Sequence, residues 1–178
     1  DMFEEYGLEV PKTHDEFIKV CDTLLENGIQ PIAAGYQEQW CTQCHFDIIA
    51  SAWYGDNEWW TKKMDLSSSF SDDAAWKGFV QQFYDEKKYW GDDPFGTNWD
   101  TAQNMMANGE AAMILNGSWT IDGVTGKNPD IKVGVFAYPT TNNPDEVTMQ
   151  MRPGNGFCLY NSQDPDKLEA GKKFINFM

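Results

Sequence analysis

The chain has 178 residues, 41% of them hydrophobic, and a formal net charge of −15 at pH 7. This length and composition fit a folded domain with a substantial buried core, and the lack of any run of about 18 apolar residues argues against a membrane-spanning helix. The negative charge would repel a phosphate backbone, which argues against nucleic acid as a partner.

The first predicted element is a helix that begins at Thr13, where Thr13 and Glu16 form a capping box that satisfies N–H groups of the first turn. Apolar residues then recur at helical spacing. Cys21 lies on this apolar stripe, which predicts a buried thiol. A short buried strand is expected at residues 29–34, although Pro31 restricts it to a strand start or a sheet edge.

The remaining chain alternates between helical and strand patterns. We expect further helices at residues 71–84, at about 98–108 and from 164 onward, and strands at 111–115, 131–138 and 157–160. A loop rich in Asn, Pro and Thr at about 140–148 is the best candidate for a linker. This alternation favours a helix-rich α/β fold with substantial parallel strand pairing.

The 8 tryptophans are unusual, because an excess of Trp indicates either a heavy core or stacking surfaces for a ligand. Most lie on helical patterns, and we expect these mainly in the core: Trp53, Trp59, Trp60, Trp76, Trp90 and Trp99. Trp119 instead follows a predicted strand and a turn, where a side chain can project into a crevice at the strand ends.

Several segments together form a recognisable order. The most specific is NGEAAMILNGSW at residues 108–119, and it is accompanied by YGLEVPKT at 6–13, GIQPIA at 28–33, VGVF at 133–136 and a Gly-rich turn from residue 153. In this order, and over nearly the whole chain, they resemble the extracellular solute-binding proteins of sugar-importing ABC transporters, the group that contains maltose-binding protein. No single segment would carry the resemblance alone.

The resemblance implies an α/β fold of the type II periplasmic-binding-protein kind, in which two lobes enclose sugar in a cleft. Residues 1–140 would form most of the second, C-terminal lobe, and residues 141–178 would return to the first, N-terminal lobe. The chain stops inside an apolar helical pattern, so we expect it to be a fragment of a longer protein.

The family is also expected to set the function. The resemblance implies a receptor without enzymatic activity or cofactor, which delivers an oligosaccharide or another small polar solute to the permease subunits of an ABC importer. Such a receptor would lie outside the cytoplasm, in the periplasm or held on the outer face of the cell membrane by a lipid anchor.

A sugar site needs flat aromatic platforms and planar hydrogen-bonding groups, because a sugar presents C–H faces and a rim of hydroxyls. In the family, the aromatic residue that ends the Asn-Gly-x-Trp segment commonly stacks on sugar, and Trp119 matches it; packing of Trp119 between helix and sheet is the alternative. Asn116 is expected either to bond a sugar hydroxyl or to supply a left-handed turn before Gly117.

The resemblance places a second group of site residues after the first strand. Trp40, Glu38 and Gln39 lie where the family often has an aromatic and polar groups. Arg152 and Asn155 flank the Gly-rich turn that would face the cleft from the other lobe, although Arg152 could equally form a surface ion pair.

Residues 40–45, WCTQCH, carry two chemical motifs, one typical of thiol–disulfide enzymes and one of c-type haem attachment. A helix start would lower the pKa of a thiol, but no thioredoxin-like βαβ pattern accompanies the pair. Zinc would need four ligands, and only Cys41, Cys44 and His45 are local. We expect no metal, and either a local disulfide or two thiols; a thiol–disulfide oxidoreductase that uses Cys41 and Cys44 is the alternative function.

Overall fold

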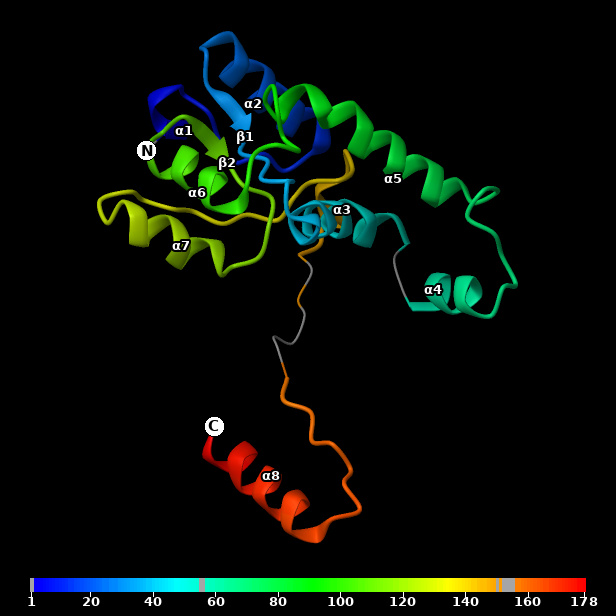
Figure 1. The fold of residues 1–178 in the computed structure, drawn as a ribbon. Helices are drawn as coiled ribbons and strands as arrows, with labels where there is room; N and C mark the ends of the chain where they lie inside the picture. Colours follow the sequence, from blue (N-terminus) through cyan, green and yellow to red (C-terminus); the bar gives the residue numbers. More distant parts are fainter. Residues whose placement is uncertain (1, 55–56, 150, 152–155) are drawn as a thin grey trace.

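The structure is a computed structural model that describes residues 2–54, 57–149, 151 and 156–178. Most of the chain forms one α/β body, and helix α8 lies apart from it (Figure 1). The body contains helices α1 (Met2–Glu5), α2 (His14–Glu26), α3 (Gln39–Tyr54), α4 (Asn57–Met64), α5 (Ala74–Asp85), α6 (Trp99–Ala107) and α7 (Thr120–Lys127), with short 3-10 helices η1 (Glu86–Tyr89) and η2 (Pro144–Glu146). The predicted helix-rich α/β character is therefore confirmed.

Two short parallel strands lie at the centre of the body. Strand β1 (Gln30–Ile32) pairs with β2 (Ala111–Met113), with Gln30 opposite Ala111 and Ile32 opposite Met113. Pro31 fits because the ladder does not use its position: the Gln30 N–H donates to Glu110 O (3.2 Å) and the Ala33 N–H to Met113 O (2.8 Å).

Helix α2 begins as its sequence predicts. The Thr13 side chain accepts a hydrogen bond from the Glu16 N–H (3.3 Å), while the Glu16 carboxylate accepts from the Lys12 N–H (2.7 Å) rather than from Thr13 itself. Its apolar stripe is buried, and Cys21 is fully enclosed. This burial confirms the predicted buried thiol, and it raises the pKa of Cys21.

Two predicted strands are absent. Residues 131–138 and 157–160 form no strand, and the sheet in the described part of the chain contains β1 and β2 alone. Apolar composition was sufficient to suggest a strand there, but a strand also needs a neighbour that supplies ladder hydrogen bonds. Tyr138 is instead fixed through its side chain, which contacts Gln82 and Glu86.

The tryptophans are less buried than the helical patterns predicted. Of the six expected in the core, all of which are described, Trp90 is buried, while Trp53 and Trp60 are 40% and 42% exposed. The expectation was wrong for these two because they lie where α3 and α4 reach the rim of the body. There the aromatic rings pack on one another: the ring centroids of Trp59 and Trp60 are 4.8 Å apart.

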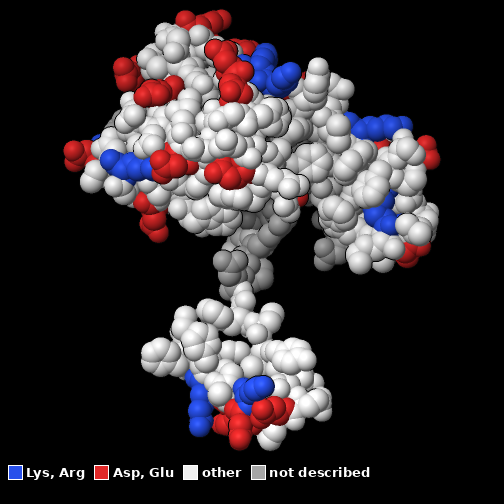
Figure 2. Space-filling model, viewed as in Figure 1, with Lys and Arg blue, Asp and Glu red and all other residues white. Residues whose placement is uncertain are grey.

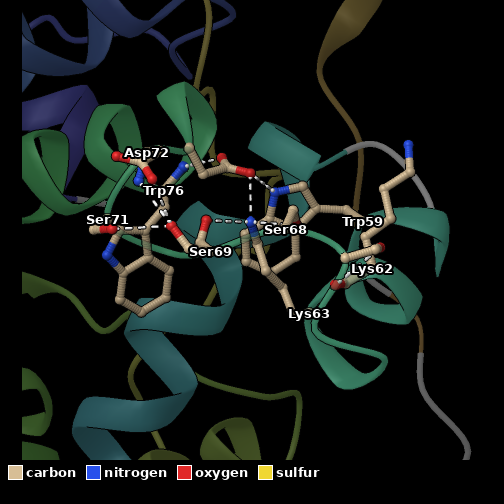
Figure 3. A network of polar contacts seen from close by, with 10 residues as sticks. Trp59, Lys62, Lys63, Ser68, Ser69, Ser71, Asp72 and Trp76 are labelled. Atoms are coloured by element: carbon tan, nitrogen blue, oxygen red, sulfur yellow. Dashed lines mark hydrogen bonds and ion pairs between the residues drawn. The ribbon is translucent and has the colours of Figure 1, made fainter.

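A buried lysine joins α4 to the start of α5 (Figure 3). The Lys63 Nζ donates to Ser68 Oγ (2.9 Å), Ser69 O (2.8 Å) and Asp73 Oδ2 (2.7 Å). It also lies 4.8 Å from the centroid of the Trp59 ring, a cation–π distance. Asp73 caps α5 by accepting the N–H of Trp76 (2.9 Å), so the Lys63 ammonium group connects α4 to the middle of the loop and to the N-cap of α5.

The last segment forms α8 (Pro165–Phe177), which begins at Pro165 after the N-cap Asp164 as predicted. None of the described side chains of α8 is buried. The Phe157 and Phe174 rings lie 6.0 Å apart, so this segment packs on itself. The predicted linker at 140–148 contains η2, and its beginning is held by α2, because the His14 N–H donates to Thr141 O (2.9 Å).

Candidate functional site

The predicted site residues come from two neighbouring loops. One is the loop from the end of β1 to α3, which carries Glu38, together with the first turn of α3, which carries Gln39 and Trp40; the other runs from the end of β2 to α7 and carries Asn116 and Trp119. Because β1 and β2 are parallel and adjacent, both loops leave the same edge of the sheet. Arg152 and Asn155 lie outside the described residues.

Trp119 presents an open aromatic face. It is 56% exposed and stands at the N-cap of α7, where its side chain makes no capping hydrogen bond. Its ring lies against Gly117 so closely that a β-carbon at position 117 would overlap it. A side chain at position 117 would thus require the Trp119 ring to move, a constraint that sequence spacing alone did not indicate.

Asn116 does not supply a left-handed turn. Its φ is not positive, and its Oδ1 accepts the N–H of Gly117 (2.8 Å). The interpretation of Asn116 as a left-handed turn residue was therefore wrong; the turn here is closed instead by Gly117, whose carbonyl accepts the N–H of Thr120 (3.0 Å). The hydrogen-bonding role of Asn116 stays a prediction, with its amide NH2 as the donor group.

The loop after β1 builds a second aromatic surface. The Glu38 Oε2 accepts the N–H of Trp99 (2.8 Å), which fixes the first turn of α6 to this loop. Trp40 is 39% exposed and meets Trp99 edge to face, with ring centroids 5.1 Å apart at 68°. Trp99, which was expected in the core, is therefore a half-buried wall of this surface.

Close packing makes this arrangement rigid. A β-carbon at Gly35 would lie 3.0 Å from Asn98 O and from Ala102 Cβ, so the loop and α6 approach as closely as a glycine allows. Backbone bonds continue the contact, because the Gln37 N–H donates to Thr97 O (3.1 Å). Gln39 is exposed at the first position of α3.

The charge on the visible face is predominantly negative. Acidic side chains are spread over the body, and the lysine side chains of its described residues lie in several separate places (Figure 2). This face offers no basic stripe of the kind that a nucleic acid backbone requires.

Cys41 and Cys44 of WCTQCH lie in the first turns of α3. Neither forms a disulfide, and neither do Cys21 and Cys158, so all four cysteines of the chain are thiols. Burial, with the nearby Glu38 charge, raises the pKa of Cys41 to about 12. The pKa of this thiol is therefore raised, and not lowered as a helix start alone would cause, and desolvation is the largest cause.

His45, the last residue of the motif, has both ring nitrogens in contact with other side chains. His45 is fully buried and contacts Tyr36 and Glu86. In the described part of the chain, no three His, Cys, Asp or Glu side chains gather in a way that could hold a metal ion. Within the motif, Cys41 and His45 are thus part of the core, whereas Trp40 and Gln43 are exposed.

The raised pKa predicts that Cys41 reacts slowly with alkylating reagents. We expect iodoacetamide at pH 8 to modify Cys41 at least about a hundredfold more slowly than the exposed Cys158, because alkylation requires the thiolate. In urea the two cysteines should react at equal rates, which serves as the control. Rapid modification of Cys41 in the native protein, read by peptide mass spectrometry, would contradict this and revive the oxidoreductase alternative.

Comparison with known proteins identifies the family of the chain that carries these loops. The family profile described as "Bacterial extracellular solute-binding protein" matches residues 1–178. The chain belongs to this family. No helix in the described ranges is both long and apolar enough to cross a membrane.

Individual members of the solute-binding family are distant but extend over the whole chain. The Multiple sugar-binding protein of Streptococcus mutans is 25% identical over 186 residues, which cover 99% of this chain and 42% of that protein. The Melibiose/raffinose/stachyose-binding protein MelE of Bacillus subtilis is 24% identical over 187 residues, which cover 100% of this chain and 42% of MelE. This solute-binding chain therefore spans about two fifths of the length of these relatives.

A solved structure confirms the fold of the solute-binding chain. The sugar transporter structure from Bacillus licheniformis in complex with stachyose superimposes with a TM-score of 0.68 at 16% identity, covering 99% of this chain and 47% of that one. The expected type II periplasmic-binding-protein fold, in partial form, is thereby established.

Proposed function

We propose that this chain is part of a receptor that binds an oligosaccharide and passes it to an ABC importer, without catalysing a reaction. The observation that carries the proposal is the pair of open tryptophan faces, Trp119 and Trp40, on loops that leave one edge of the parallel pair. Two relatives that are named as sugar-binding proteins, and the related structure in complex with stachyose, support the same ligand class.

The chemistry of the two loops suits a sugar. Each tryptophan offers an apolar face to the C–H groups of a pyranose ring, and a half-exposed ring can stack without first being unpacked from a core. Glu38, Gln39 and Asn116 offer planar carboxylate and amide groups to hydroxyls, and the carboxylate makes the stronger, charge-assisted bond. Since Glu38 already uses Oε2 to hold Trp99, its Oε1 is the oxygen that we assign to the ligand.

The proposal includes a division into lobes. Residues 1–140 form most of the second lobe, residues 141–178 return to the first, and Arg152 and Asn155 face the sugar from that side. The absence of buried side chains in α8 supports this division, since an apolar helix face needs a partner to cover it. Closure of the lobes around sugar would then select a closed state by its higher affinity.

The same proposal sets the place and the partners. The receptor acts outside the cytoplasm, in the periplasm or on a lipid anchor at the outer face of the membrane, and its protein partners are the membrane permease subunits of the importer. The family description supports an extracellular site of action.

A tryptophan-fluorescence titration of the complete natural protein tests the proposal. We expect raffinose, stachyose or another oligosaccharide from a panel to change the emission saturably, with a dissociation constant in the micromolar range or tighter, which corresponds to roughly 8 kcal/mol of binding free energy. Oligopeptides and polyamines serve as ligands of other classes. Saturation by one of these, with none by any sugar, would replace carbohydrate as the ligand class.

A further inference from the structure

A chain of buried polar groups runs through the core beneath the loop that carries Glu38 and Trp40. The Tyr36 hydroxyl contacts His45 Nδ1, His45 Nε2 lies 3.3 Å from Glu86 Oε2, and the Tyr138 hydroxyl donates to Glu86 Oε1. All four side chains are buried, and Glu86 is 1% exposed. Burying a carboxyl group at such depth costs folding free energy unless its oxygens accept hydrogen bonds from neighbouring groups.

The donors and acceptors of this chain form one consistent order. Burial and the charge of Glu86 raise the pKa of Tyr36 well above its ordinary value, and the same two causes raise that of Tyr138, so both keep their phenolic proton. Tyr36 O–H then donates to His45 Nδ1, His45 Nε2–H donates to Glu86, and Tyr138 O–H donates to the other carboxylate oxygen. Glu86 is the acceptor on which both branches end.

One branch closes the base of the loop. Tyr36 lies directly before residues 37–44, which are the end of the loop and the first residues of α3, and His45 follows them on the second turn of α3. The contact between Tyr36 and His45 therefore joins the two ends of this segment. The tip of the same loop is held by Glu38, through its bond to the Trp99 N–H. The position of Trp40 between these two points depends on both.

The other branch reaches the segment that leaves the body. Tyr138 precedes residues 139–142, which α2 holds through the bond from His14 N–H to Thr141 O (2.9 Å) and the bond from Asp15 N–H to Asn142 Oδ1 (2.9 Å). Glu86 therefore ties the loop after β1 and this outgoing segment to one point in the core.

We propose that Glu86 is a positioning residue for ligand binding, which acts through His45 and Tyr36 to hold Trp40 and Glu38 in place against the outgoing segment at 138–142. This inference rests on the proposed function, because it assigns the loop after β1 to the ligand. Glu86 itself lies too deep to touch a ligand, so its effect is exerted through the loop.

The test uses two variants and a matched control in the complete natural protein. Tyr36→Phe keeps the ring and removes the hydroxyl, and Glu86→Gln sets an amide NH2 among groups that donate. The control is Tyr89→Phe, because Tyr89 is equally buried and lies on the same short helix η1, but its hydroxyl donates to Asp22 (2.7 Å) and not to the loop. We expect oligosaccharide affinity to fall about fivefold to tenfold in the first two variants and less than about twofold in the control.

A spectroscopic readout separates positioning from general destabilisation. The edge-to-face pair of Trp40 and Trp99 gives an exciton couplet in circular dichroism, assigned as the difference between wild type and Trp40→Phe. We expect this couplet to weaken in Tyr36→Phe and Glu86→Gln and to persist in Tyr89→Phe.

The outcomes divide cleanly. An affinity of Tyr36→Phe and Glu86→Gln within twofold of wild type, or an equal loss in Tyr89→Phe, would overturn the positioning role. If wild type binds no oligosaccharide, the proposed function fails instead, and the couplet alone then decides whether Glu86 positions the loop: an unchanged couplet in Glu86→Gln and Tyr36→Phe would overturn it.

Discussion

Replacing Lys63 by methionine is expected to lower the free energy of unfolding by about 3 kcal/mol. The side chain of Lys63 is 3% exposed, and its ammonium group makes three hydrogen bonds, one of them to Asp73. Methionine has a similar volume but leaves that carboxylate without its cation. The pKa of Asp73 is held at about 2, first of all by its bond to Lys63 and then by the Trp76 N–H, which shows how strongly the charged form is favoured.

We place this loss at the low end of the range for a broken buried pair, because Asp73 is 17% exposed and keeps bonds from Trp59 and Trp76. Lys62→Met is the matched control: it removes a neighbouring lysine whose ion pair with Glu58 (2.8 Å) lies in solvent, and it should cost less than about 1 kcal/mol. Urea unfolding of the complete protein measures both. A loss in Lys63→Met no greater than in Lys62→Met would show that the loop is held by its aromatic rings alone.

Local rules of the sequence predicted the starts of several helices, although α4 and α7 were not predicted. Thr13, Asn98 and Asp164 all cap helices in the structure, and each is a residue type whose side chain accepts N–H groups of a first turn. The parallel pairing of β1 and β2 also followed from the alternation of strands and helices, and it brings both predicted loops to one edge. Helix caps depend on residues that are close in the sequence, whereas the pairing of Gln30 with Ala111 joins distant segments and followed only from the general pattern of alternating strands and helices.

Interactions between distant residues could not be predicted in the same way. Glu38 was expected to face a ligand, yet it also holds Trp99, 61 positions along the chain. Glu86 meets Tyr138 across 52 positions, although neither residue belongs to a motif. An acid on a helical pattern gives no sign of burial until its partners are placed, because a charged residue is ordinarily exposed.

The second large effect concerns the ligand. Trp119→Ala is expected to lower oligosaccharide affinity about tenfold or more, because a stacked tryptophan is among the largest single contributors at a binding surface. Gly117→Ala should cause a comparable loss while every aromatic residue is retained, since the added β-carbon overlaps the Trp119 ring and forces it away. The second variant therefore tests the position of the ring, and the first tests its presence.

Gly126→Ala gives the control for a glycine replacement near Trp119. Gly126 lies on α7, has no positive φ, and a β-carbon there would meet nothing within 4 Å, so affinity should stay unchanged. Isothermal titration of the complete protein with the oligosaccharide found to bind best measures all three. If Trp119→Ala and Gly117→Ala both bind as wild type does, the ligand does not stack at α7, and the surface of Trp40 and Trp99 becomes the site. A loss in Trp119→Ala alone would mean that the ring can move aside from position 117 and still stack, so that its presence matters more than its resting place.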